Sequence, residues 1–368
     1  MAHCRGAART QKASGLKIVA VVGARPQFIK LAPLHWAAQA RENLHLQYVH
    51  TGQHYDREMS AVFFEDLDLA PPDQEWRLQS AAPLERLLEM TQRLGAYLLE
   101  ERPEWVLVFG DTDSTLAGSL AARLGGFRLA HVEAGLRSFN KQMPEEFNRI
   151  TADAAADLLF CSNQRAVERL QHEGNPAQAI FCGDLMYDAL LHMQNRREDQ
   201  QELCPELGSG FALLTIHRQA NLVAERVEQW LEIIRRLSTE IPVVFLAHPR
   251  TRQVIAGRDM PEKVQVLEPQ GYRNTLDLLA RCQLVLTDSG GLQKDAFFMQ
   301  KPCLTLRPET EWEELTALGV NCLTDLNWEA IQTARATFAV QNLDFSAQPF
   351  GDGQAAEKIL ISLEKHRL

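Results

Sequence analysis

The amino-acid sequence predicts an α/β protein with two doubly wound domains and a cleft between them. Short apolar runs alternate with helical patterns along the whole chain, which is typical of parallel sheets flanked by helices. Several runs are apolar on both faces, as expected for strands that helices cover on each side. The runs lie at 17–22, 46–50, 105–109, 129–132, 158–160, 180–182, 211–216, 243–247, 264–267, 284–286 and 303–306.

Two glycine-containing loops, one near each end of the chain, follow apolar runs and lead into helical patterns. The first is GARPQFIK at 23–30 and the second is TDSGGLQ at 287–293. A strand, a tight turn and a helix N-terminus together form an anion site, because free backbone N–H groups and the helix dipole point at the ligand. Two such loops predict a phosphate-bearing ligand held between the two domains. The paired glycines in Ser289-Gly290-Gly291 are the most specific local signal.

The alternation is interrupted by polar residues near 172–200, which suggests a division of the chain. We expect an N-terminal domain at 16–178 and a C-terminal domain at 179–352. The last residues form an amphipathic pattern, and we expect helix 353–368 to cross back and join the first domain. Residues 1–15 are polar and lack the apolar core of a signal peptide, so we expect a disordered tail.

Composition excludes several classes of protein. The 368 residues carry a formal net charge of −10, which argues against a nucleic-acid surface, and no apolar run approaches the length of a membrane helix. An anionic ligand therefore needs local cations, for which Arg25, Lys30, Arg218 and Arg250 are candidates at strand ends. The seven widely spaced cysteines form no C-x-x-C pair, which favours a reducing cytoplasm over disulfides or a zinc site.

Polar residues that follow the predicted strands are the candidates for chemistry, because ligands of open α/β sheets bind beyond the carboxyl ends of strands. Acidic residues gather in the first half of the chain, while imidazoles and guanidiniums gather in the second. This asymmetry suits a substrate whose reacting part lies on one domain and whose phosphates lie on the other. The residues concerned are Asp111, Asp113, Glu133, Glu145, Glu146, His217, Arg218, His248 and Arg250.

Each of these residues also has a structural interpretation. Asp111 and Asp113 can cap the following helix, or form the Asp-x-Asp metal pair of many glycosyltransferases. Glu133 can pair with Arg137, and the histidines can be satisfied within the core. Glu145 and the next glutamate can serve as first-turn helix charges. Neither glycine loop reads G-x-G-x-x-G, which argues against a dehydrogenase, and no Walker-type loop is present.

Several motifs in consistent order resemble the non-hydrolysing UDP-N-acetylglucosamine 2-epimerases. They are GARPQFIK (23–30), GDTDSTLAGSLAA (110–122), HVEAGLRS (131–138), PEEFNR (144–149), GD-x-MYDAL (183–190), HR (217–218), TDSGGLQKDA (287–296) and GDGQAAEKI (351–359). The resemblance implies a glycosyltransferase-B-like fold of two Rossmann-like domains, with UDP bound by residues 179–352. It also implies a cytoplasmic homodimer that needs no metal and no nicotinamide.

The resemblance assigns roles to residues of this chain. Asp111, Glu133 and Glu145 match the family's catalytic positions, and we expect Lys30 and His217 to join them. We expect the UDP-sugar to be bound by Arg25, Arg149, Arg218, His248, Arg250, Ser289, Gly290, Gly291, Asp295 and Arg307. The implied reaction inverts C2 of a UDP-2-acetamido sugar by eliminating UDP and adding it again, through a 2-acetamidoglucal. Remaining alternatives are a retaining glycosyltransferase, a hydrolysing epimerase and a catalytically silent UDP-sugar sensor.

Within the family, the motifs are similar to enzymes that act on UDP-2,3-diacetamido-2,3-dideoxyglucuronate, with plain UDP-N-acetylglucosamine as the alternative substrate. The N-acetylglucosamine enzymes usually carry two acidic residues where this chain has Lys294-Asp295. Asp295 stands where a longer glutamate normally holds the ribose hydroxyls. The charge of Lys294 is available, on this interpretation, to pair with the uronate carboxylate or to face solvent. Such a product suits the synthesis of a surface polysaccharide, including lipopolysaccharide O-antigen.

Overall fold

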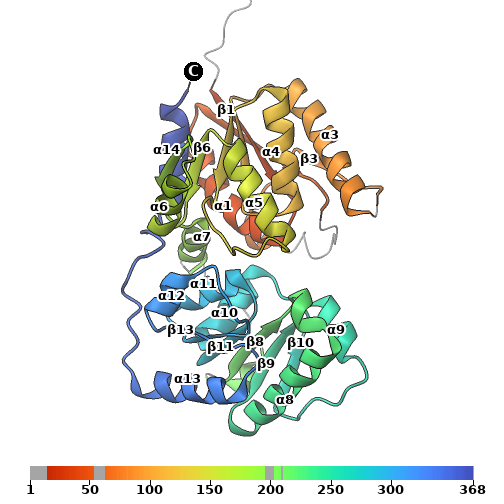
Figure 1. The fold of residues 1–368 in the computed structure, drawn as a ribbon, viewed down its shortest axis with the longest axis vertical. Helices are drawn as coiled ribbons and strands as arrows, with labels where there is room; N and C mark the ends of the chain where they lie inside the picture. Colours follow the sequence, from red (N-terminus) through yellow and green to blue (C-terminus); the bar gives the residue numbers. More distant parts are fainter. Residues whose placement is uncertain (1–14, 54–62, 81, 195–202, 209, 368) are drawn as a thin grey trace, which may run out of the picture.

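The computed structural model describes residues 15–53, 63–80, 82–194, 203–208 and 210–367 and contains two parallel sheets. All but the last residue of the predicted tail lies outside the described residues. The first sheet has the strand order β3-β2-β1-β4-β5-β6-β7 and the second β10-β9-β8-β11-β12-β13. Figure 1 shows the two domains one above the other, with helices on both faces of each sheet. The predicted α/β architecture of two doubly wound units is confirmed.

The N-terminal sheet is built from strands of two to seven residues. They are β1 (Leu16–Val22), β2 (Leu44–His50), β3 (Gln74–Glu75), β4 (Trp105–Phe109), β5 (Leu129–Val132), β6 (Leu158–Cys161) and β7 (Gln178–Phe181). The helices are α1 (Arg25–Gln39), α3 (Pro83–Glu101), α4 (Asp113–Gly125), α5 (Pro144–Ala155), α6 (Gln164–His172) and α7 (Leu185–Gln194). All five residues of β4 are buried, because α-helices cover the central strands on both sides.

The C-terminal sheet repeats the same plan. Its strands are β8 (Ala212–Ile216), β9 (Val243–Ala247), β10 (Val264–Leu267), β11 (Leu284–Thr287), β12 (Cys303–Thr305) and β13 (Asn321–Leu323). Its helices are α8 (Ala224–Glu240), α9 (Pro249–Ile255), α10 (Tyr272–Arg281), α11 (Gly290–Phe298), α12 (Glu313–Ala317) and α13 (Trp328–Val340), with short 3₁₀ turns at Pro205–Leu207 and Gln219–Leu222; the last helix of the chain is α14 (Ala355–Lys365). In both sheets the strand order reverses beside the first strand, and ligands bind at such switch points.

The C-terminal helix α14 lies against the N-terminal domain, where it packs on α1 and α7 (Figure 1). Arg41 donates to Glu364 at 2.7 Å, and the Trp105 indole N–H donates to the Leu363 carbonyl at 3.3 Å. Ile359 and Leu360 are fully buried. The chain therefore crosses between the domains a second time, after α13. The N-terminal sheet also takes β7, which extends past residue 178 to Phe181.

The first glycine loop is occupied by its own helix. The N–H groups of Gly23 and Ala24 donate to Gln27 Oε1 at 2.7 and 3.1 Å, so these donors do not point at a ligand. Gly23 is required for packing, because a Cβ there would lie 2.1 Å from Ser114 Oγ and 2.2 Å from Thr51 Oγ1. The prediction of a backbone anion site at this loop is therefore wrong. The carboxamide of Gln27, from the first turn of α1 within the same motif, takes that position.

No helix in the described part of the chain is long and apolar enough to cross a membrane. The six cysteines among the described residues are free thiols.

Candidate active site

Glu133 follows β5 directly and is held by two lysines. Its Oε2 atom accepts a hydrogen bond from Lys30 of α1, and its Oε1 atom accepts one from Lys294 of α11 at 3.0 Å. Burial raises the pKa of a carboxyl group, but here the two ammonium groups outweigh it and hold the pKa of Glu133 well below its usual range. Lys30 and Glu133, both predicted to be catalytic, are thus in direct contact as an ionised pair.

The backbone around Glu133 is adapted to this placement. Glu133 has a φ of 68°, a left-handed conformation that is unfavourable for a residue with a side chain and that clusters at functional sites. Gly110, at the end of the neighbouring β4, leaves room for the carboxylate. A Cβ at Gly110 would lie 3.1 Å from Glu133 Oε2 and 3.6 Å from Lys30 Nζ.

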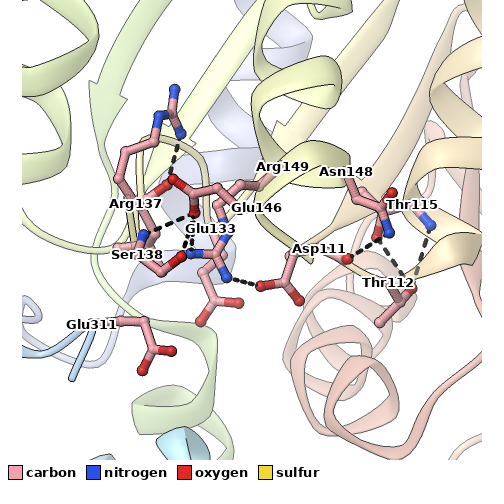
Figure 2. A network of polar contacts seen from close by, with 12 residues as sticks. Asp111, Thr112, Thr115, Glu133, Arg137, Ser138, Glu146, Asn148, Arg149 and Glu311 are labelled. Carbon is pink, nitrogen blue, oxygen red and sulfur yellow. Dashed lines mark hydrogen bonds and ion pairs between the residues drawn. The ribbon is translucent and has the colours of Figure 1, made fainter. Parts of the chain in front are cut away.

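Asp111, one residue further along, forms an ion pair with Arg149 of α5 (Figure 2). The Arg149 guanidinium is buried and also contacts Glu146 at 3.2 Å. Asn148 donates to the Asp111 carbonyl at 3.0 Å and to Asp113 at 3.3 Å. Thr112, rather than either aspartate, supplies the side-chain cap of α4. The structure therefore places Arg149 beside an acidic cluster that includes Asp111 and Glu146.

Glu145 and Glu146 lie in different environments. Glu146 is 2% exposed and accepts bonds from the Ser138 N–H at 2.8 Å and the Phe139 N–H at 2.9 Å, so it fixes the loop before α5. Glu145 is exposed at the first turn of α5, and no hydrogen bond or ion pair of its side chain occurs within the described residues. Glu145 is therefore the glutamate of this pair that remains available to a substrate.

A buried histidine connects the strand ends that carry Asp111 and Glu133. The His131 ring contacts Asp153 through Nδ1 and the Gly110 carbonyl through Nε2, both at 2.7 Å. Asp153 also pairs with Arg137 at 2.7 Å, so Arg137 has Asp153 rather than Glu133 as its partner in this network. Burial opposes ionisation of Asp153, but its bonds to the histidine and the arginine hold its pKa below the usual range. This network fixes β4, β5 and α5 relative to one another beneath the site.

The second glycine loop keeps the geometry of an anion site. Ser289 caps α11 by accepting from the Leu292 N–H at 3.4 Å, and the Ser289 N–H is bonded to Thr287 Oγ1 at 2.9 Å. The N–H groups of Gly290 and Gly291 form no hydrogen bond within the described residues. These two donors at the start of a nine-residue helix are placed to bind a phosphate.

Asp288, between β11 and this loop, orients His217. It is fully buried and accepts bonds from the N–H groups of His217 and Arg218 at 3.0–3.1 Å and from Asn221 Nδ2 at 2.9 Å. His217 Nδ1 lies 3.2 Å from Asp288 Oδ1, while the His217 side chain is 39% exposed. Burial opposes ionisation, but the hydrogen bonds, first among them that of His217, lower the pKa of Asp288. His217 therefore has a fixed Nδ1 and an accessible Nε2.

The remaining predicted binding residues surround Glu311 or lie at the periphery. Arg307 forms a two-bond pair with Glu311 at 2.9 and 3.0 Å, and Arg218 lies 3.6 Å away from the same carboxylate. The Glu311 charge also acts on Arg149, and Figure 2 shows Glu311 facing the acidic cluster from the other domain. The Glu311 carboxylate of the C-terminal domain and the Arg149 guanidinium of the N-terminal domain thus attract each other.

Arg25 begins α1, and its guanidinium lies 5.7 Å from the centre of the Phe63 ring. The His248 ring lies 6.3 Å from the His217 ring, and Arg250 is exposed one turn away. Asp295 is buried and bonded by Tyr272 at 3.1 Å. Burial raises the pKa of Asp295 to about 7, although Lys294 opposes the shift.

Sequence reasoning missed three buried carboxylates as site residues: Asp184, Asp288 and Glu311. Each was part of a quoted motif or of the loop after Arg307, and the partners of Asp184 and Asp288 lie far along the chain, while Glu311 pairs with the nearby Arg307. Asp184 binds Lys294, 110 positions away, and Asp288 binds the residue pair at 217–218. The described residues contain no group of three or more side chains placed to hold a metal ion.

The fold and the site define a class of enzyme. A sheet pair of this plan is shared with a spinosyn forosaminyltransferase at a TM-score of 0.54 and 16% identity, over 96% of this chain and 95% of that one, which is a likeness of fold alone. The fold is therefore glycosyltransferase-B-like, with two α/β domains. A sequence profile described as UDP-N-acetylglucosamine 2-epimerase matches residues 37–364. The chain belongs to this family of isomerases.

Two curated relatives cover nearly the whole chain. A UDP-2,3-diacetamido-2,3-dideoxy-D-glucuronate 2-epimerase of Pseudomonas aeruginosa is 40% identical over 355 residues, covering 95% of this chain and all of the relative. A UDP-N-acetylglucosamine 2-epimerase of Methanocaldococcus jannaschii is 34% identical over 362 residues, covering 94% and 98%.

Solved structures of epimerases superpose closely. The M. jannaschii UDP-GlcNAc 2-epimerase in complex with UDP-GlcNAc and UDP has a TM-score of 0.87 at 33% identity, covering 95% of this chain and all of that one. The Neisseria meningitidis enzyme bound to UDP-GlcNAc has the same TM-score at 26% identity, with the same coverage.

Proposed function

We propose that this protein is a non-hydrolysing 2-epimerase of a UDP-2-acetamido sugar, acting by elimination and re-addition of UDP. The observation that carries the proposal is that Asp111 and Glu133 end adjacent strands of one domain, opposite the Ser289 helix and His217 of the other. Carboxylates on the sugar side and N–H donors on the phosphate side are what this reaction requires.

The C2 hydrogen of the sugar is not acidified by a carbonyl group, so the leaving group must depart first. In the proposed path the C1–O bond breaks, its electron pair leaves with UDP, and a carboxylate removes the C2 proton from the resulting oxocarbenium ion. The product of this half-reaction is a 2-acetamidoglucal. A proton is then delivered to the opposite face of C2, and the UDP oxygen attacks C1 to restore the bond.

The residues divide by role in this path. Gly290, Gly291 and His217 stabilise the charge that develops on the departing diphosphate. Glu133, ionised between its two lysines, faces the sugar and offsets the positive charge at C1. Asp111 and the exposed Glu145 are the groups left to exchange protons, and we assign proton transfer to this pair. Arg25, Arg149, Arg218, His248, Arg250, Asp295 and Arg307 are proposed to contact the UDP-sugar.

For the substrate, we propose UDP-2,3-diacetamido-2,3-dideoxyglucuronate over UDP-N-acetylglucosamine. The support is the 40% identity to a relative named for that activity. We also propose a homodimer; the outer face of α3 exposes Leu84 and Leu88 by 67% and 59%, and such leucines suit a subunit interface. The product would serve the synthesis of a surface polysaccharide.

The test is incubation with each UDP-sugar in heavy water, followed by NMR of the product. We expect the C2 epimer with deuterium at C2, and a higher kcat/KM for the uronate. Asp111→Asn and Glu145→Gln should each lower turnover by roughly 100- to 10,000-fold, the range for loss of an acid or base group, while UDP affinity changes little. Product without deuterium at C2 would contradict elimination, and near-normal turnover of folded variants would contradict the assigned roles.

A further inference from the structure

Lys294 belongs to the C-terminal domain, but its ammonium group forms ion pairs with carboxylates from the first half of the chain. It lies on α11 and is 1% exposed. Its Nζ atom lies 2.5 Å from Asp184 Oδ2 and 3.0 Å from Glu133 Oε1, and 4.2 Å from the centre of the Trp312 ring. A buried ammonium group is unfavourable unless it is paired and hydrogen-bonded. Two carboxylates and an aromatic face meet that requirement here.

The partners of Lys294 are themselves fixed. Asp184 Oδ1 accepts from the Met186 N–H at 2.8 Å at the start of α7, and the Asp184 N–H donates to the Phe350 carbonyl at 2.9 Å. Phe350 packs edge-on against Trp312, with 5.5 Å between ring centres. The ammonium group therefore lies in a frame built from α7, α11 and the segment that returns to the first domain.

The Glu133 carboxylate receives one lysine from each domain. Lys30 of α1 binds Oε2, and Lys294 of α11 binds Oε1. Without Lys294, one oxygen of a buried carboxylate would lose its partner, and Asp184 would lose its counter-charge. A third carboxylate from a uronate sugar would have to displace one of two existing partners, so the earlier interpretation of Lys294 as a cation for the sugar is not favoured.

We propose that Lys294 is a positioning residue, which reaches across the domain boundary to hold Glu133 ionised and oriented. This inference rests on the proposed function, in which Glu133 faces the reacting sugar. The Glu133 carboxylate then has both of its lysine partners only while the two domains are in contact. Epimerases with an acidic residue at this position, as the resemblance implies for the N-acetylglucosamine enzymes, would need another partner for the equivalent of Glu133.

The test measures the ionisation of Glu133 directly, by ¹³C NMR of protein with labelled glutamate carboxyl groups. The Glu133 signal is assigned by its absence in Glu133→Gln. The charged and titratable groups that face this carboxylate and Lys294 are Lys30, Asp184, Asp295 and Tyr272. The principal variant is Lys294→Met combined with Asp184→Asn, which removes one cation and one anion and so leaves no new unpaired Asp184 charge.

In the wild type we expect Glu133 to stay ionised down to the acid limit of folding. In the double variant its titration midpoint should rise by about one to three pH units, the effect of losing an opposite charge at this range, and kcat should fall more than UDP affinity. Lys294→Arg should restore a low midpoint. A merely structural role of Lys294 would lower stability without moving this midpoint.

An unchanged midpoint in the folded double variant would overturn the inference. Asp184→Asn alone provides a second test, because it keeps Lys294 and should therefore leave Glu133 ionised; a raised midpoint there would assign the effect to Asp184 instead and also overturn the inference. The titration uses no substrate, so its outcome is independent of whether either UDP-sugar is turned over. Failure of turnover on both sugars would count against the proposed function alone.

Discussion

The contact between Asp288 and His217 allows a quantitative prediction for Asp288→Asn. The buried carboxylate accepts from two backbone N–H groups at 3.0–3.1 Å, from Asn221 at 2.9 Å, and from His217 Nδ1 at 3.2 Å. An asparagine keeps one acceptor oxygen and presents an N–H₂ group in place of the other. If the oxygen keeps its bonds to Arg218 and Asn221, the new donor faces His217 Nδ1. The histidine must then place its proton on Nε2 and can no longer accept one there.

The magnitude follows from these bonds. A hydrogen bond to a charged group contributes about 1.5–3 kcal/mol to stability, against about 0.5–1.5 kcal/mol for a neutral one. Loss of the charge at two or three bonds therefore lowers the free energy of unfolding by about 3 kcal/mol at pH 7. Turnover should fall by roughly 100- to 1,000-fold, because His217 beside a neutral asparagine stabilises the departing diphosphate less well.

The stability difference should also depend on pH. The pKa of Asp288 is lowered in the folded protein. Its contribution is therefore present above the unfolded value of about 3.9 and is lost as the pH falls through the folded pKa. Below pH 4 the stabilities of wild type and Asp288→Asn should converge.

The assay is urea unfolding at a series of pH values, with kcat measured on the UDP-sugar that is turned over. The matched control is Asp277→Asn, which removes a carboxylate paired with Arg281 on the same helix at 2.8 Å. Such a pair contributes about 0.3–0.5 kcal/mol, so this variant should keep its activity. Near-wild-type turnover of folded Asp288→Asn would refute the role given to His217, and a stability loss under 0.5 kcal/mol would refute the account of the bonds.

Two further predictions concern packing and metal dependence. Gly23→Ala should lower the free energy of unfolding by about 1–3 kcal/mol, because its Cβ would lie 2.1 Å from Ser114 Oγ. Gly95→Ala, inside α3 with nothing within 4 Å of the new Cβ, should instead stabilise the protein by about 0.5–1 kcal/mol. Equal effects of the two substitutions in urea unfolding would contradict the packing argument. Activity should survive EDTA and dialysis, since the described residues hold no metal cluster; recovery of a chelated, inactive enzyme on addition of manganese would favour the glycosyltransferase alternative.

The central strands were predictable because a strand that is buried on both faces has a continuous apolar run in its sequence. The predicted runs at 105–109, 129–132 and 243–247 match the central strands β4, β5 and β9 residue for residue, and the run at 264–267 matches the edge strand β10. The edge strands β3 and β13 were missed. Gln74–Glu75 is two exposed polar residues, and Asn321–Leu323 is a three-residue strand whose last residue is exposed, so neither carries a periodic apolar signal.

Part of the site was predictable because functional residues of such folds lie just beyond the carboxyl ends of strands. Asp111, Glu133 and His217 each come directly after a strand or one residue later, and a single sequence displays that position. The partners of these residues were not predictable in the same way, because pairing depends on how two domains meet. Glu133 and Lys294 are 161 positions apart, and no local pattern relates them. The first glycine loop failed for a related reason, since its composition does not reveal that Gln27 folds back onto it.

Lys294 shows why the charge of a residue is a weaker guide than its surroundings. A lysine that replaces a glutamate beside a sugar site suggests a contact with an acidic substrate, and the uronate offers one. Lys294 is 1% exposed, and its ammonium group is bonded to two carboxylates at 2.5 and 3.0 Å, so its charge is already paired within the protein. A preference for the uronate, if measured, must then come from other cations of the site, such as Arg218 and Arg307, which share the Glu311 carboxylate. Lys294→Arg should therefore retain the preference between the two UDP-sugars even where it lowers kcat.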